Sequence, residues 1–123
     1  MPLSPILVVE DSPTERQLIQ RALEGLGFRV VTLGDGNDIV KTVQRDKPGL
    51  ILLDVVLPGA NGFQLCRQLK TTPETKDVKV ILLTSKAQES DRFWGMKQGA
   101  DEYLTKPFKN DDLAAAVRRH FVD

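Results

Sequence analysis

Five short apolar runs alternate with longer amphipathic segments along the chain. Most of the runs are rich in leucine and β-branched residues. The five runs are Ile6–Val9, Phe28–Leu33, Leu50–Leu53, Val78–Leu83 and Glu102–Thr105. The first and third runs are apolar at every position, which is typical of strands buried on both faces of a sheet. We therefore predict five strands in a parallel sheet with helices on both sides.

The segments between the runs carry apolar residues at helical spacing. The first segment opens with Ser12-Pro13-Thr14-Glu15, a capping box with Ser12 as N-cap and Pro13 as first helical residue, and it closes at Gly27. We expect Asn110 to cap the last helix. The stripes expected on the core side are Leu18, Ile19, Ala22, Leu23 and Leu26; Ile39, Val40 and Val43; Phe63, Cys66 and Leu69; Phe93 and Met96; and Leu113, Ala114, Val117 and Phe121.

The order of these elements, a strand followed by a helix five times, predicts an α/β fold. The connections are short, and crossovers between parallel strands are almost always right-handed, so we expect a doubly wound sheet. We interpret residues 1–123 as a single domain that begins with a short tail, residues 1–5.

Composition narrows the class of protein. With 41% apolar and 28% charged residues the chain is not disordered, and 17 basic residues balance 17 acidic ones. A formal net charge of zero gives no bulk attraction to nucleic acid or to an anionic membrane. The single cysteine, Cys66, excludes an intramolecular disulfide and a cysteine-based zinc site. We see no signal peptide and no membrane-length apolar stretch, and we expect a soluble, cytoplasmic domain.

Polar residues gather where the predicted strands end. Glu10 and Asp11 follow the first run, Asp54 the third, Thr84 the fourth and Lys106 the fifth. Ligands of open parallel sheets bind outside these carboxyl ends. Two carboxylates 4 Å apart repel by about 4 kcal/mol at an effective dielectric near 20, so we expect a cation among the three acids. Oxygen ligands favour Mg²⁺, or Mn²⁺ in its place, over zinc.

The same set of residues indicates phosphoryl chemistry. A cation together with the Lys106 ammonium and the Thr84 hydroxyl would stabilise a dianionic, oxygen-rich group. Asp54 is the expected nucleophile, because carboxylates form acyl phosphates.

As an ordered set, these residues resemble the receiver domain of bacterial response regulators, the CheY-like family. The resemblance covers residues 6–121 and implies a five-stranded sheet in the order 2-1-3-4-5 with five flanking helices. The segments that carry it are Glu10-Asp11, residues 54–62, Leu83-Thr84-Ser85 and residues 99–108.

The resemblance implies how the acceptor and the metal are arranged. Asp54 would be the phosphoacceptor. Glu10, Asp11 and Asp54 would hold Mg²⁺ together with the backbone carbonyl of Val56. Glu10 is a conservative variant, since two aspartates are common in the family.

The resemblance also implies the residues that bind and respond to the phosphoryl group. Thr84 and Lys106 would contact phosphoryl oxygens, and Tyr103 would be an aromatic switch whose rotamer follows Thr84. Val56 and Lys86, two residues beyond the acceptor and the threonine, would tune the lifetime of the phosphoryl group. The alternative is that these two positions simply tolerate variation at the rim of the site.

The partners follow from the same likeness. A sensor histidine kinase or a phosphotransfer protein would donate the phosphoryl group. Because the chain ends with the last predicted helix, we expect a stand-alone receiver that signals to a protein target through its fourth helix, fifth strand and fifth helix. Phe93, Trp94 and Tyr103 are assigned to this output face, and we expect the chain to be a monomer or a weak dimer formed through this face. The segment 91–99 is similar to receivers of pilus-motility clusters.

The adjacent aromatic residues Phe93 and Trp94 cannot both face the core, because neighbouring helical residues point about 100° apart. We predict that Phe93 and Met96 lie on the buried side and that Trp94 lies at the boundary or outside. An exposed Trp94 would be an interface anchor, and a partly covered one would shield the flank of the fifth strand.

Three alternatives use the same residues. A phosphatase of the haloacid-dehalogenase type needs a second acid two residues after its nucleophile, where this chain has Val56. Flavin mononucleotide binding fits the fold, but Glu10 and Asp11 would repel its phosphate. A receiver that acts as a phosphate sink or scaffold without an effector stays open. The chain is accordingly interpreted as a phosphoacceptor with self-catalysed transfer and autodephosphorylation rather than as an enzyme.

Overall fold

The computed structural model describes residues 3–123, so Met1 and Pro2 of the predicted tail lie outside the described residues. The main strands are β1 (Ile6–Val9), β2 (Val30–Leu33), β3 (Leu50–Leu53), β6 (Val80–Thr84) and β7 (Glu102–Thr105). The helices are α1 (Pro13–Gly25), α2 (Ile39–Asp46), α3 (Gly62–Thr71), α4 (Glu89–Lys97) and α5 (Asn110–His120). Within residues 3–123, none of the helices has the length and apolar content needed to span a membrane.

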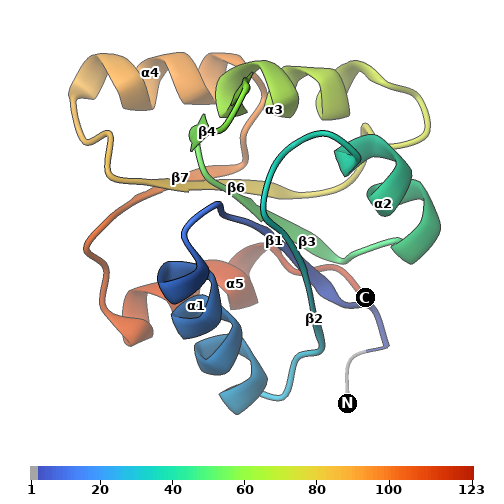
Figure 1. Cartoon of the computed structure of the whole chain (residues 1–123), viewed down its shortest axis with the longest axis vertical. Coiled ribbons are helices and arrows are strands. Elements are labelled where there is room, and N and C mark those ends of the chain that lie inside the picture. The colour runs from blue at the N-terminus through green and yellow to red at the C-terminus, as the bar shows by residue number, and fades with distance from the viewer. Residues whose placement is uncertain (1–2) are drawn as a thin grey trace.

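The main strands form one parallel sheet in the order β2-β1-β3-β6-β7. This is the predicted order 2-1-3-4-5, because a small hairpin takes the labels β4 and β5. Helices α1 and α5 cover one face of the sheet, and α2, α3 and α4 cover the other (Figure 1). The prediction of a doubly wound α/β fold is confirmed.

Alternate residues of each central strand pack into two different hydrophobic clusters, one on each face of the sheet. In β1, Leu7 and Val9 pack in the cluster that includes residues of α2 and α3, whereas Ile6 and Val8 pack in the cluster that includes residues of α1 and α5. Both faces are therefore apolar, which explains why the sequence shows continuous apolar runs instead of alternation.

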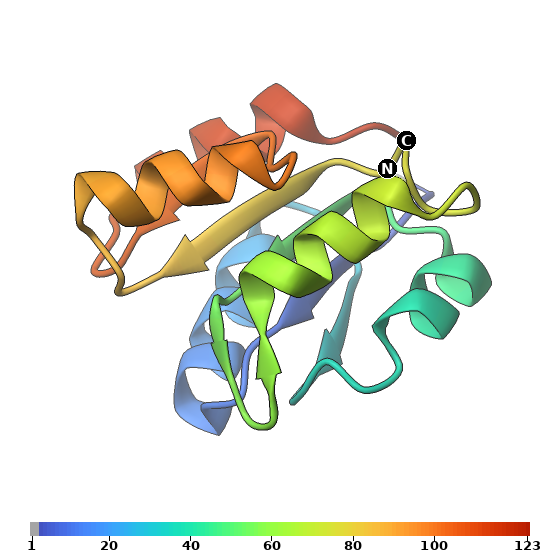
Figure 2. The same ribbon diagram turned by 90° about the horizontal axis from the view of Figure 1, so that it is seen from above.

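A short hairpin, which the sequence interpretation missed, follows β3. Its strands are β4 (Val56–Leu57) and β5 (Ala60–Asn61), and Gly59 between them has a φ of +64°, a conformation that glycine adopts without strain. The hairpin projects beyond the end of the sheet before α3 begins (Figure 2). Val56 is consequently 55% exposed. The Pro58-Gly59 dipeptide was a usable turn signal.

The ends of the helices confirm some predictions and correct others. In α1 the Ser12 hydroxyl accepts a hydrogen bond from the Glu15 N–H at 3.3 Å, as expected of an N-cap. Leu18, assigned to the core stripe, is 62% exposed because the buried side of α1 centres on Ile19 and Leu23. The prediction of a cap at Asn110 is wrong, since Asn110 is itself the first residue of α5.

The burial predicted for Phe93 and Met96 in α4 is also wrong, whereas the outer position predicted for Trp94 is confirmed. Phe93 and Met96 are exposed, as is Trp94, and Gly95 is the buried residue of the helix. A Cβ placed on Gly95 would lie 2.9 Å from Leu82, so the helix approaches the sheet through its smallest residue. The large neighbours of Gly95 therefore point away from the core.

The two ends of the described chain meet at the amino ends of the central strands. The Asp123 carboxylate accepts hydrogen bonds from the backbone N–H groups of Leu3 and Ser4, at 3.0 and 2.8 Å. The Val122 N–H also donates to the Gly49 carbonyl at 3.0 Å, just before β3. The described part of the predicted tail is thus fixed to the C-terminus.

Candidate functional site

Three of the predicted site residues meet at the carboxyl ends of β1, β3 and β7. The Lys106 ammonium lies 2.9 Å from an Asp54 carboxylate oxygen, and it also donates to Glu10. The side chains of Glu10 and Asp54 are 3% and 9% exposed, and that of Lys106 is 11% exposed. The carboxylates and the ammonium thus form a nearly buried cluster of opposite charges.

Backbone groups fix the two carboxylates. The Asp54 N–H donates to the Val9 carbonyl at 3.0 Å, continuing the pairing of β3 with β1 by one residue. One Asp54 carboxylate oxygen accepts the Val56 N–H at 3.1 Å, and a Glu10 carboxylate oxygen accepts the Ser12 N–H at 3.1 Å. The turns after β1 and β3 therefore orient both acids toward Lys106.

The pKa values of Glu10 and Lys106 depend on burial and on the neighbouring charges of the cluster. Burial, together with the neighbouring Asp54 carboxylate, raises the pKa of Glu10 to about 7, although hydrogen bonds from Lys106 and the Ser12 N–H act in the opposite direction. Burial alone would lower the pKa of the Lys106 ammonium, but its hydrogen bonds to Glu10 and Asp54 outweigh burial and raise that pKa. Lys106 therefore stays charged and offsets the repulsion expected between the two acids.

The expectation that three carboxylates meet is corrected by the position of Asp11. Asp11 is exposed, and within residues 3–123 no group of three or more acidic, histidine or cysteine residues gathers closely enough to hold a metal ion. Lys106 gathers Glu10 and Asp54 but does not contact Asp11. In chemical terms the oxygen donors of Glu10, Asp11, Asp54 and the Val56 carbonyl still fit a hard dication such as Mg²⁺.

Thr84 and Tyr103 both contact the backbone of Lys86. Thr84 ends β6 and is fully buried, and its hydroxyl oxygen accepts the Lys86 N–H at 3.4 Å. The Tyr103 hydroxyl donates to the Lys86 carbonyl at 2.7 Å. Burial raises the pKa of Tyr103 to about 12. The segment after β6 is therefore connected to both residues, while the Lys86 side chain is exposed at the rim.

The three residues assigned to the output face do not share one exposed surface. Phe93 and Trp94 are 62% and 55% exposed, but Tyr103 is 3% exposed. The Tyr103 ring is turned inward because its hydroxyl finds an acceptor at Lys86. In this conformation the exposed part of α4 presents Phe93, Trp94 and Met96 without Tyr103.

Two contacts were missed by the sequence interpretation. Glu15, interpreted as part of a helix cap, lies 3.2 Å from the Lys106 ammonium. Arg92 donates to the Tyr103 carbonyl at 2.9 Å. An acid in the first turn after a strand-end carboxylate was a weak signal for Glu15, whereas nothing in the spacing indicated Arg92.

An apolar groove of about 530 Å³ lies beside the cluster, between α1 and the loop after β7. The exposed Leu18 contributes to it. The residues that line the groove are Glu15, Leu18, Ile19, Arg21, Ala22, Lys106, Pro107, Phe108 and Asn110.

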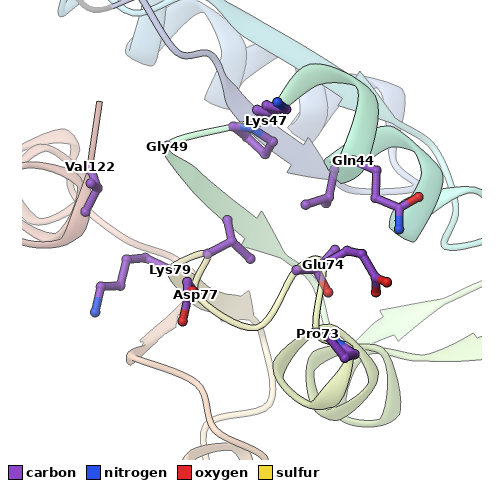
Figure 3. A pocket seen from close by; sticks show the side chains of 12 residues that line it. Gln44, Lys47, Gly49, Pro73, Glu74, Asp77, Lys79 and Val122 are labelled. Atoms are coloured by element: carbon purple, nitrogen blue, oxygen red, sulfur yellow. The ribbon is translucent and has the colours of Figure 1, made fainter.

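A second cavity, of about 550 Å³, lies near the amino ends of β3 and β6 (Figure 3). Two lysines and two acids are among the residues that line it, and none of the predicted site residues is. The residues labelled in the figure are Gln44, Lys47, Gly49, Pro73, Glu74, Asp77, Lys79 and Val122. The chemistry predicted from the sequence lies at the opposite ends of the strands.

Comparison with known protein families identifies the family of this chain. Residues 6–118 match the model of the response regulator receiver domain. The chain belongs to this family. The chain is 44% identical over 112 residues to the protein PilH of Pseudomonas aeruginosa. These aligned residues make up 91% of this chain and 93% of PilH.

Two solved structures share the fold of this receiver domain. The BeF₃-activated receiver domain of RstA from Klebsiella pneumoniae has a TM-score of 0.89 and 32% identity, over 95% of this chain and 97% of that one. The receiver domain of the sensor histidine kinase PA1611 from Pseudomonas aeruginosa has a TM-score of 0.87 and 33% identity, over 95% and 96% of the two chains. The PA1611 structure has a magnesium ion coordinated in its active-site cleft.

Proposed function

We propose that Asp54 accepts a phosphoryl group from the phosphohistidine of a sensor histidine kinase or a phosphotransfer protein. The observation that carries this proposal is the Lys106 ammonium held between the buried carboxylates of Asp54 and Glu10. In the transfer, an Asp54 oxygen bonds to phosphorus while the phosphorus–nitrogen bond of the donor breaks. The electron pair of that bond stays on the imidazole nitrogen.

The other residues of the site have separate roles. Glu10, Asp11, Asp54 and the Val56 carbonyl would hold Mg²⁺, which supplies positive charge to the phosphoryl oxygens. The Lys106 ammonium, already 2.9 Å from Asp54, binds a phosphoryl oxygen in place of one of its present carboxylate partners. The magnesium ion of the PA1611 receiver supports this assignment.

The signal passes through Thr84 and Tyr103. When the Thr84 hydroxyl turns to a phosphoryl oxygen, its contact with the Lys86 N–H breaks and the segment after β6 moves. Tyr103 is hydrogen-bonded to the same segment, so its ring responds. A protein target binds the face of α4, β7 and α5, where exposed Phe93 and Trp94 provide apolar contacts.

Val56 and Lys86 set the lifetime of the aspartyl phosphate. Val56 is apolar and exposed on the hairpin beside Asp54, so it cannot orient an attacking water by hydrogen bonding. Lys86 carries a long side chain that is exposed at the rim. Slow autodephosphorylation follows from this pair.

The similarity to PilH supports the assignment to the subgroup of pilus-motility and taxis receivers, acting in the cytoplasm. A receiver without an effector, serving as a phosphate sink or scaffold, is the second candidate. A screen for proteins whose affinity for the chain depends on phosphorylation separates the two. Steady turnover of a small phosphomonoester would instead favour the phosphatase, which lacks its second acid here at Val56.

Incubation with acetyl phosphate and Mg²⁺ tests the acceptor. Mass spectrometry is expected to show one added phosphoryl group on the wild-type chain and none on Asp54→Asn. A chelator is expected to prevent the reaction, because the phosphoryl oxygens then lack the dication. Labelling of Asp54→Asn, or equal labelling in excess chelator, would contradict the assignment.

A further inference from the structure

Arg92 on α4 contacts Tyr103 in two ways. Its guanidinium donates a hydrogen bond to the Tyr103 backbone carbonyl at 2.9 Å. The guanidinium carbon also lies 5.3 Å from the centre of the Tyr103 ring, within the range of a cation–π contact. One side chain therefore binds both the backbone and the ring of the proposed switch residue.

The backbone of α4 comes close to the same ring one turn later. A Cβ on Gly95 would lie 3.2 Å from Cδ2 of Tyr103, closer than ordinary van der Waals contact. The inward ring thus packs beside Gly95 and Arg92, and its hydroxyl reaches the Lys86 carbonyl. An outward rotation of the ring would lose the cation–π contact and this hydroxyl hydrogen bond.

We propose that Arg92 is a positioning residue that holds Tyr103 in the inward rotamer and thereby favours binding of a phosphoryl group at Asp54. This inference rests on the proposed function, in which the positions of Thr84 and Tyr103 are coupled. Arg92 lowers the free energy of the inward state. A phosphoryl group favours the same state in this proposal, because the Thr84 side chain leaves space for the inward ring when it turns to a phosphoryl oxygen. By linkage, each then strengthens the other.

Lys97 provides a matched control on the same helix. Its ammonium lies 5.4 Å from the centre of the Phe93 ring, so it forms the same kind of contact with an exposed aromatic residue. Replacing Lys97 removes one positive charge from α4 without touching Tyr103. The variants Arg92→Gln and Lys97→Gln therefore differ in which ring loses its cation.

The experiment uses the fact that Tyr103 is the only tyrosine of the chain. Labelling with 3-fluorotyrosine gives one ¹⁹F signal, measured without any phosphoryl analogue and with a soluble paramagnetic quencher that broadens exposed groups. In Arg92→Gln the signal is expected to shift and to broaden more with the quencher. Lys97→Gln is expected to match the wild type, and Arg92→Lys, which keeps a charge and a donor, to lie between them. An unchanged signal in Arg92→Gln overturns the proposal.

A second measurement connects the rotamer to the site. The affinity for beryllofluoride with Mg²⁺ is expected to fall about fivefold in Arg92→Gln, the equivalent of one cation–π contact, and to stay unchanged in Lys97→Gln. Equal affinity in Arg92→Gln and wild type would refute the coupling to Asp54. If the wild type itself binds no beryllofluoride, the proposed function fails, while the ¹⁹F comparison still decides whether Arg92 holds the ring. Circular dichroism confirms that each variant is folded.

Discussion

The Lys70 ammonium on α3 and the Asp101 carboxylate before β7 form an ion pair of 2.7 Å that is largely shielded from solvent. The same carboxylate oxygen of Asp101 accepts the Val80 N–H at 2.8 Å. Lys70 also donates to the Val78 carbonyl at 2.7 Å. The pair therefore fastens the loop before β6 to α3 and to the start of β7. The amino-acid sequence alone gives no sign of this partner for Lys70.

Removing the Asp101 carboxylate is expected to destabilise the fold. Asp101→Asn weakens the pairing of a mostly buried ammonium and of the Val80 N–H, at a cost of about 1–3 kcal/mol. Urea unfolding at neutral pH measures the loss. Asp46→Asn, which breaks a solvent-exposed pair with Arg45, is the control and is expected to show no measurable change.

The effect of Asp101 is also expected to depend on pH. Burial alone would raise the pKa of Asp101, but hydrogen bonds from Lys70 and the Val80 N–H outweigh burial and lower that pKa below 3.8. The carboxylate therefore stabilises the fold fully above the unfolded-state pKa, and this contribution disappears as the pH falls through the lower folded-state pKa. The stability difference between wild type and Asp101→Asn should shrink below about pH 4. A constant difference down to pH 2 would argue against the ion pair.

Lys106→Met is expected to destabilise the metal-free chain by about 3 kcal/mol, because it leaves the buried carboxylates of Glu10 and Asp54 without their cation. Thermal unfolding in chelator measures this. The double variant Lys106→Met with Glu10→Gln removes one of the two charges and should recover part of the loss. If the double variant is less stable than Lys106→Met alone, repulsion between the acids is not the cause.

The lifetime of the aspartyl phosphate should shorten when polar side chains are placed at the rim. Val56→Asn combined with Lys86→Glu supplies groups that can orient a water near Asp54, so decay of the phosphorylated chain is expected to accelerate. Decay is followed by phosphoprotein gel mobility after removal of excess acetyl phosphate. Because both wild-type side chains are exposed, the fold should tolerate the change. Equal or slower decay would favour the alternative that these positions merely vary.

Trp94, the only tryptophan of the chain, should report on the output face. Its fluorescence is expected to change when beryllofluoride and Mg²⁺ are added, and not to change in Asp54→Asn. Since the side chain is 55% exposed, Trp94→Ala should weaken binding of the target by about 1–3 kcal/mol while leaving stability nearly unchanged. A large loss of stability with intact target binding would instead show that Trp94 acts in packing.

The sequence predicted best those features that depend on a single property, the hydrophobicity of a run or the charge at its end. Continuous apolar runs predicted the buried strands, and charged residues at their ends predicted the meeting of Glu10, Asp54 and Lys106. The arrangement of α4 was not predictable in this way. A helical stripe is inferred from large apolar residues, whereas α4 packs through Gly95, and Phe93 and Met96 are left exposed.

Contacts between distant segments were also beyond the sequence. The contact between Glu15 and Lys106 depends on the direction of α1 relative to β1. The contact between Arg92 and Tyr103 depends on the distance between α4 and the sheet. Each involves a long side chain whose partner is chosen by three-dimensional proximity. The exposure of Asp11, next to the buried Glu10, was not predictable from residue type either, because both are acids at the end of the same strand.

The hydrogen bonds from Leu3 and Ser4 to Asp123 bring the two ends of the described chain together at the amino ends of the strands, away from Asp54. A linker of a few residues would therefore join these ends and make circular permutation feasible. New ends opened at the exposed Pro58-Gly59 turn would place a fused reporter on the hairpin that follows Asp54, the proposed phosphoacceptor. The chain thus offers a geometry for a sensor in which the reporter, rather than a partner protein, detects the phosphorylated state.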